Sequence, residues 1–141
     1  MKFFIASPWK NKDEVYKLSD EIRKRGHEGT SFIESGANLL SGQPIENEMQ
    51  IFSEALENWQ SDKRVSDIFN SEIKSLRECD VVILLLPAGI SSHLEAGMAY
   101  GMNKKTILIG PVNKPEIVYL IFNKIYIDTT SFLKDLDSNA V

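Results

Sequence analysis

The run VVILLLP, Val81–Pro87, is the feature that most constrains the fold of this chain, because no polar side chain interrupts it. A strand with one face in water alternates apolar and polar residues, whereas a strand that is covered on both faces is apolar throughout. The run therefore predicts a central strand of a parallel sheet, with helices packed against both sides of that sheet.

Segments of strand and helix character alternate on both sides of this run. Further strands are predicted at residues 3–7, 27–34, 105–110 and 123–128. Apolar side chains at helical spacing predict helices at residues 11–26, 66–79, 91–103, 114–122 and 129–136. Right-handed crossovers between such units favour a flavodoxin-like α/β fold, a three-layer sandwich with a five-stranded parallel sheet of order 2-1-3-4-5.

The length of 141 residues is enough for one domain with its own hydrophobic core. We predict a single domain over residues 1–141, with a loop and a helix inserted at about 35–65. In that stretch a segment rich in glycine and serine precedes apolar residues at mostly helical spacing. Insertions at such junctions often form one wall of a binding site.

Composition disfavours several classes of partner. The net charge of −4 and the pI of about 5.2 argue against a nucleic-acid polymer or an anionic membrane. No segment reaches the roughly 18 apolar residues of a membrane span, and the N-terminus turns polar too soon for a signal peptide, so a cytoplasmic location is expected. The single cysteine, Cys79, is expected to be a buried side chain. No His, Cys and Asp cluster has the spacing of metal ligands, so neither a metal nor another cofactor is expected.

The segment SSHLEAGMAYG, Ser91–Gly101, follows the central run and places Glu95 near the start of a predicted helix. One interpretation is a capping box, in which Ser92 caps the helix and Glu95 bonds back to the backbone N–H of the cap. The other is a reactive carboxylate at the rim of a pocket, because open α/β sheets bind ligands at the carboxyl ends of their strands. In a first turn, the helix dipole would keep this carboxylate ionised, as a nucleophile or charge stabiliser requires. The residues alone leave both interpretations open.

Three motifs together resemble those of the nucleoside 2-deoxyribosyltransferase family and its relatives that hydrolyse the N-glycosidic bond of nucleoside monophosphates. These are FFIASPW near the start, Glu72 eight positions before Asp80, and S-x-x-E-x-G-x-A ending at Ala99. The resemblance covers most of the chain and is specific from about Ile68 to Gly110. It implies an enzyme that cleaves or exchanges the N-glycosidic bond of a (deoxy)nucleoside or nucleoside monophosphate.

The resemblance also implies roles for two carboxylates. Glu95 would attack C1′ of the sugar, and Glu72 would lie near the base and protonate it as it leaves. Two positions differ from the transferases of the family: Gly89 stands in place of a base-contacting aspartate, and Phe3 in place of a tyrosine that touches the nucleophile.

Four further residues are candidates for substrate binding. Ser7 and Trp9 follow the first predicted strand, where Ser7 would bond a sugar hydroxyl and Trp9 would stack on a base, although core or surface packing explains the tryptophan equally well. Ser91 and Ser92 would receive a 5′-phosphate or 5′-hydroxyl at the helix start, with capping as the simpler role of Ser92.

Two other functions stay open at this point. One is a NAD glycohydrolase like those among TIR domains, which share this architecture and use a glutamate. The other is a non-catalytic nucleotide-binding or sensor module, which the substitutions at Phe3 and Gly89 favour. The family assembles so that neighbouring subunits complete each other's sites, and the apolar residues at 45–60 and 115–122 fit self-association, so a homo-oligomer, dimer or larger, is predicted.

Overall fold

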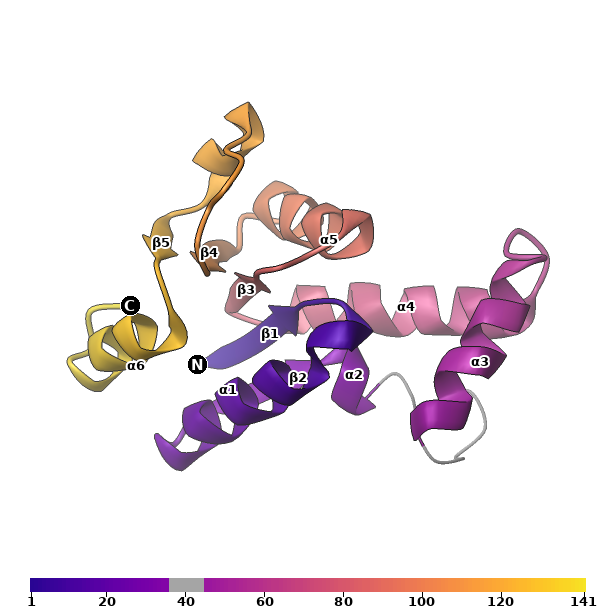
Figure 1. Ribbon diagram of the computed structural model, residues 1–141, viewed down its shortest axis with the longest axis horizontal. Coiled ribbons are helices and arrows are strands. Elements are labelled where there is room, and N and C mark those ends of the chain that lie inside the picture. The colour runs from indigo at the N-terminus through magenta and orange to yellow at the C-terminus, as the bar shows by residue number, and fades with distance from the viewer. Residues whose placement is uncertain (36–44) are drawn as a thin grey trace.

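The computed structural model describes the backbone of residues 1–35 and 45–141, and the side chains of 1–34 and 49–141. One parallel sheet holds the strands β1 (Lys2–Ala6), β2 (Glu28–Ser31), β3 (Val81–Leu85), β4 (Lys105–Ile109) and β5 (Lys124–Tyr126). Their order in space is β2-β1-β3-β4-β5, so the predicted flavodoxin-like order is confirmed (Figure 1).

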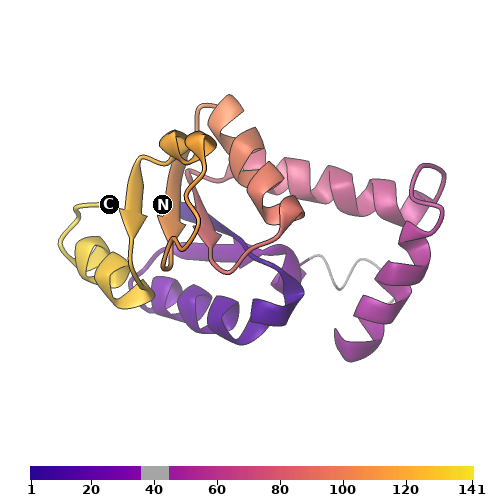
Figure 2. The same ribbon diagram turned by 45° about the horizontal axis from the view of Figure 1, so that its top comes forward.

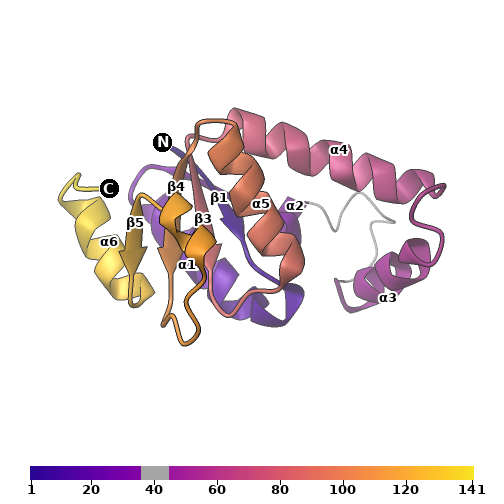
Figure 3. The ribbon, with the colours of Figure 1, turned by 90° about the horizontal axis from the view of Figure 1, so that it is seen from above.

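The described part of the chain holds helices that cover both faces of this sheet and others that stand beside it. They are α1 (Lys12–Lys24), α2 (Phe32–Ser35), α3 (Ile45–Leu56), α4 (Lys63–Glu78), α5 (Ile90–Gly101) and α6 (Thr129–Asp137). Two short 3-10 helices, η1 (Trp9–Asn11) and η3 (Ile117–Ile121), lie in the connections. Seen from above, α4 and α5 lie on one side of the sheet and α1 and α6 on the other, which gives the three predicted layers (Figure 3).

Alternate residues of the strands fill two separate cores. In β1, Phe3 and Ile5 pack on the side of α1 and α6, whereas Phe4 and Ala6 pack on the side of α4 and α5. All five residues of β3 are buried, because this strand lies between two neighbours and under both helix layers. The continuous apolar run of the sequence therefore has the physical cause that was predicted for it.

The register of the sheet sets where a site can form. Ala6 of β1 lies opposite Leu84 of β3, so the loops that follow these two strands leave the sheet side by side. The chain order reverses between β1 and β3, which is the switch point at which open α/β sheets leave a crevice.

Several element boundaries differ from the predictions because polar side chains cap the helices. The strand predicted at 27–34 ends at Ser31, whose hydroxyl accepts the N–H of Glu34 and starts α2. The helix predicted from Ser66 begins at Lys63, because Asp62 accepts the N–H of Arg64 at 2.9 Å.

The segment predicted as a helix at 114–122 contains only the 3-10 helix η3.

The helix predicted within residues 35–65 is present as α3, which ends at Leu56, and the residues up to Asp62 form turns. The loop predicted before it falls on residues 36–44, outside the described chain. Helix α3 stands beside the first turns of α4, away from the sheet (Figure 2).

The single-domain boundaries stay a prediction. Among the described helices, none combines the length and the apolar character needed to cross a membrane.

Candidate active site

Helix α5 begins one loop after β3 and carries the predicted nucleophile. Its N-cap is Gly89, which has an extended backbone, and no side chain bonds into the first turn as a cap. Ser92 therefore lies inside the helix and Glu95 lies in the second turn. The capping-box interpretation is wrong, because a capping box needs its serine at the N-cap position.

Glu95 is buried on the inner side of α5, with only 8% of its surface exposed. Ala96 and Ala99, on the same side of the helix, pack into the core against β1, β3 and β4. Glu72 extends from α4, which packs against α5, and its carboxyl group is hydrogen-bonded to the carboxyl group of Glu95. The structure thus brings together the two residues that the sequence singled out as catalytic.

Burial raises the pKa of Glu95 to about 9, and the charge and hydrogen bond of Glu72 add to this effect. Burial also raises the pKa of Glu72, whereas the hydrogen bond from Glu95 lowers it. Two carboxyl groups in contact repel each other when both are ionised, and Glu95 is buried while Glu72 is half-buried, so the pair shares one proton at neutral pH. The expectation that a helix dipole keeps Glu95 ionised is wrong, because Glu95 lies beyond the first turn and its burial dominates.

Ser7 ties the loop after β1 to the end of β3. Its hydroxyl donates to the backbone oxygen of Leu85 at 2.9 Å and accepts a hydrogen bond from the amide of Asn11, also at 2.9 Å. The hydroxyl proton of Ser7 is therefore already used within the protein. Sequence reasoning missed Asn11, although its place four residues after Ser7 is a spacing at which side chains meet in one turn.

Trp9 lies on a different side of the sheet from the carboxyl pair. Its half-buried ring packs against the core between the sheet and α1, and the amine of Lys12 lies 5.2 Å from the centre of the ring. Phe3 packs in that same core, so the first-strand residues on the Glu95 side are Phe4 and Ala6. The base-stacking role of Trp9 stays a prediction.

The start of α5 holds the remaining candidate residues. Gly89 and Ser91 are exposed, whereas Ser92 is 5% exposed and its hydroxyl has no hydrogen-bond partner among the described residues. The first N–H groups of a helix have no partner within the helix, so they and this hydroxyl leave unused donors one turn before Glu95.

His93 joins this helix start to the segment after β4. Its Nδ1 lies 2.7 Å from the oxygen of Gly89, its Nε2 lies 2.9 Å from the hydroxyl of Tyr119, and the two rings are stacked. Since a carbonyl oxygen only accepts, Nδ1 carries a proton. Sequence reasoning missed Tyr119, because no local spacing links it to His93.

Solved structures of other proteins share the fold of this chain. No protein-family model and no curated protein matches the sequence. The 2-deoxyribosyltransferase of the psychrotolerant bacterium Bacillus psychrosaccharolyticus is similar in structure, with a TM-score of 0.70 and 16% identity over 94% of this chain and 90% of that chain. The chain has the nucleoside 2-deoxyribosyltransferase-like fold. The CMP N-glycosidase BcmB of Clostridium botulinum is also similar, with a TM-score of 0.53 and 18% identity over 97% of this chain and 99% of that chain.

Proposed function

We propose that this chain cleaves or exchanges the N-glycosidic bond of a (deoxy)nucleoside or nucleoside monophosphate, with Glu95 as the nucleophile. The observation that carries the proposal is the contact between the buried carboxyl group of Glu95 and the half-buried carboxyl group of Glu72, on the two helices that cover one side of the sheet. A 2-deoxyribosyltransferase and a CMP N-glycosidase share the fold, which supports the same class of bond as the target. The substrate is a small molecule, and the chemistry needs neither a metal nor another cofactor.

The single proton of the pair fits this reaction. Breaking an N-glycosidic bond develops positive charge on the sugar, which a carboxylate stabilises or captures as a covalent glycosyl ester. When substrate binds, Glu95 passes its proton to Glu72 and becomes the carboxylate that attacks C1′. Glu72 then gives that proton to the nitrogen of the base, the C1′–N bond breaks, and the neutral base leaves.

The second half of the reaction reverses these roles. An acceptor base or a water molecule attacks C1′ of the ester, Glu72 takes the proton of the attacking group, and Glu95 is released. A base gives transfer and water gives hydrolysis, so the outcome depends on how far the closed site excludes water. The hydroxyl of Ser92, which has no hydrogen-bond partner in the described part of the chain, and the exposed Ser91 suit the 5′-group of the sugar, beside the first-strand loop with Ser7.

A nucleotide-binding module without turnover is the second candidate. The lack of a side chain at Gly89 favours it, because the transferases of the family have a base-contacting aspartate at this position and this chain has no such contact there. In either case we propose a homo-oligomer in the cytoplasm.

The test is incubation of the protein with a panel of nucleosides, nucleoside monophosphates and NAD, with and without a free acceptor base. Chromatography distinguishes a new nucleoside, which indicates transfer, from a free base alone, which indicates hydrolysis. Release of nicotinamide from NAD would instead indicate a TIR-like glycohydrolase. No product from any substrate would favour the binding module.

The Glu95→Gln variant is expected to lower turnover by roughly three orders of magnitude or more, because it removes the nucleophile while keeping its shape. Glu72→Gln is expected to lower turnover too, most strongly for bases that leave poorly without a proton. Glu78→Gln is the matched control, since Glu78 is an exposed residue of the same helix α4. Wild-type rates in Glu95→Gln would refute the assigned nucleophile.

A further inference from the structure

The start of α5 is built on a glycine and has no side-chain cap. Its N-cap, Gly89, is exposed, and a Cβ atom built there would meet nothing within 4 Å, so close packing does not hold this residue. Glycine also has more conformational freedom than any other residue. A binding site at this helix start needs its donors in fixed positions, so another part of the chain must hold the segment.

The side chain of His93 holds the segment from within the first turns of α5. Its Nδ1–H donates to the backbone oxygen of Gly89 at 2.7 Å, and the backbone N–H of His93 donates to the same oxygen at 3.2 Å. With the proton on Nδ1, the neutral ring leaves Nε2 as an acceptor, which receives the hydroxyl proton of Tyr119 at 2.9 Å. One imidazole therefore joins the peptide group of Gly89 to η3.

Tyr119 is fixed in turn by the sheet. At the end of η3, the hydroxyl of Thr106 in β4 donates to the backbone oxygen of Ile121 at 2.6 Å. The backbone N–H and oxygen of Thr106 each bond to Asn123 at 2.8 Å, and Thr106 is fully buried. The ring of Tyr119 packs against the core between the sheet and α5, and it stacks on the ring of His93 with the two centres 5.8 Å apart. Strand β4 therefore sets the position of the residue that His93 contacts.

The contact between His93 and Tyr119 stands between two hollows. One, of about 380 Å³, lies between the loop after β3 and the segment after β4, where Pro87 and Asn113 line it. The other, of about 910 Å³, lies between α5 and η3. His93 and Tyr119 line both hollows. Where side chains do not fill the space between two segments, packing does not fix their distance, so the bond that crosses the space does.

We propose that His93 and Tyr119 are positioning residues that fix the start of α5 for the 5′-group of the substrate. Through the oxygen of Gly89 they hold the first turn, whose serine hydroxyls and unpaired N–H groups receive a 5′-phosphate. His93 precedes Glu95 by two residues, so its side chain leaves α5 on a different side from the nucleophile. The inference rests on the proposed function, because it adds two residues to the same site.

Calorimetric titration with a nucleoside monophosphate and with the matching nucleoside tests this role. The titrations use Glu95→Gln, which keeps the shape of the site without turnover. Tyr119→Phe removes one hydroxyl group and keeps the stacked ring. In the Glu95→Gln background, this change is expected to raise the dissociation constant of the monophosphate at least roughly fivefold and that of the nucleoside less than about twofold. A general loss of structure would weaken the two ligands alike, so the ratio of the two constants measures positioning.

A double-mutant cycle shows whether Tyr119 acts through His93. His93→Ala is expected to weaken binding of the monophosphate by a similar factor, and adding Tyr119→Phe to it is expected to weaken binding by less than about twofold more. Tyr100→Phe is the matched control, because Tyr100 is an exposed tyrosine of the same helix. It is expected to leave both dissociation constants unchanged.

These titrations separate the positioning role from the proposed reaction, because binding needs no turnover. Monophosphate binding that depends on Tyr119, in a wild-type protein that releases no base, would support the positioning role and refute the reaction. Three results would overturn the positioning role: unchanged binding in Tyr119→Phe, equal losses for nucleoside and monophosphate, or no binding of any nucleotide. Independent effects of His93→Ala and Tyr119→Phe would also contradict it.

Discussion

At the scale of single residues, the site depends on a carboxyl group whose surroundings oppose its charge. Glu95 is buried beside Glu72 on the inner side of α5, where the other buried residues are alanine and serine. Burial keeps water away from the ionised form of Glu95, and the carboxyl group of Glu72 adds a like charge, so Glu95 retains its proton. The same arrangement that prepares proton transfer also costs stability once the proton is lost.

This cost predicts a pH dependence of folding stability. Between the ordinary pKa of a glutamate and about 9, the folded chain binds more protons at Glu95 than the unfolded chain does. The contribution of Glu95 to the free energy of unfolding is therefore fully present at acid pH, and it is lost as the pH rises toward 9. Glu95→Gln is expected to raise the free energy of unfolding at pH 8 by on the order of 2 kcal/mol, with little change at pH 4.

Urea unfolding of wild-type protein and Glu95→Gln across this pH range measures the effect. Glu78→Gln serves as the exposed control and is expected to leave the pH profile unchanged. A Glu95→Gln protein less stable than wild type at pH 8 would show that the carboxyl is ionised and stabilised there.

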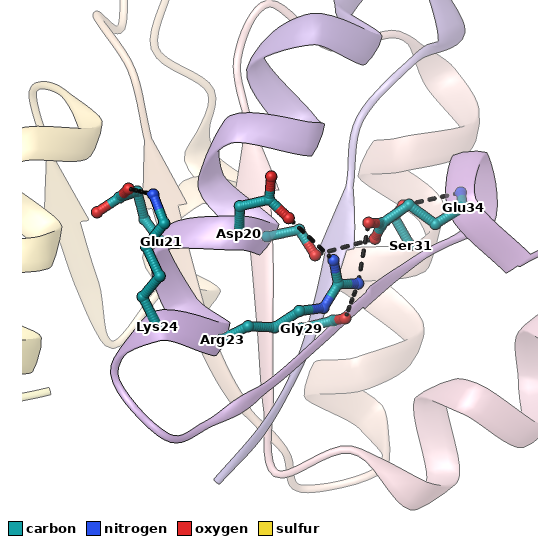
Figure 4. Close-up of polar contacts among 8 residues, drawn as sticks. Asp20, Glu21, Arg23, Lys24, Gly29, Ser31 and Glu34 are labelled. Carbon is teal, nitrogen blue, oxygen red and sulfur yellow. Dashed lines mark hydrogen bonds and ion pairs between the residues drawn. The ribbon is translucent and has the colours of Figure 1, made fainter.

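At the scale of elements, a polar cluster fastens the edge strand β2 to α1 and α2. The carboxylate of Glu34 accepts hydrogen bonds from the hydroxyl groups of Ser19 and Ser31. It also forms an ion pair with Arg23 at 2.9 Å, and Arg23 donates a hydrogen bond to the backbone oxygen of Gly29 at 2.7 Å (Figure 4). Ser19 and Ser31 are fully buried, so this network satisfies polar groups that water does not reach. It fixes how closely α1 packs against β2.

Gly29 is the point of closest approach in this cluster, which gives a second prediction. A Cβ atom at Gly29 would lie 2.9 Å from the hydroxyl of Ser19 and 3.2 Å from its backbone oxygen. Gly29→Ala is therefore expected to destabilise the fold by about 1–3 kcal/mol, because α1 must move away from β2. Chemical denaturation measures the loss, and Glu28→Ala, at the exposed preceding residue, is expected to change stability by less than about 0.5 kcal/mol.

At the scale of the whole molecule, the sheet brings distant loops to one edge. Ser7 bonds to Leu85, 78 positions later, and α5 starts from the same edge of β3. The carboxyl groups of Glu95 and Glu72 meet where α5 packs against α4.

Ligand binding at this site is expected to raise the melting temperature of the whole molecule. A ligand that binds only the folded state at 100 times its dissociation constant adds about 2.7 kcal/mol to the free energy of unfolding. In Glu95→Gln, which keeps the shape of the site, a nucleoside monophosphate is expected to raise the melting temperature without product formation. Scanning fluorimetry with chromatography of the same samples checks this, and the absence of a shift with every nucleotide would contradict a nucleotide site.

The sequence by itself determined the number and order of the strands, because continuous apolar runs and helical spacing record which residues are removed from water. It also singled out Glu95 and Glu72, but it placed Glu95 at a helix start, because S-x-x-E is a local pattern that also fits a cap. Only the tertiary structure decided that the carboxyl group of Glu95 meets that of Glu72, that Ser7 bonds to Leu85, and that His93 joins Tyr119. A sequence pattern shows which side of a helix is buried, whereas the packing of helices on the sheet decides which side chains meet there.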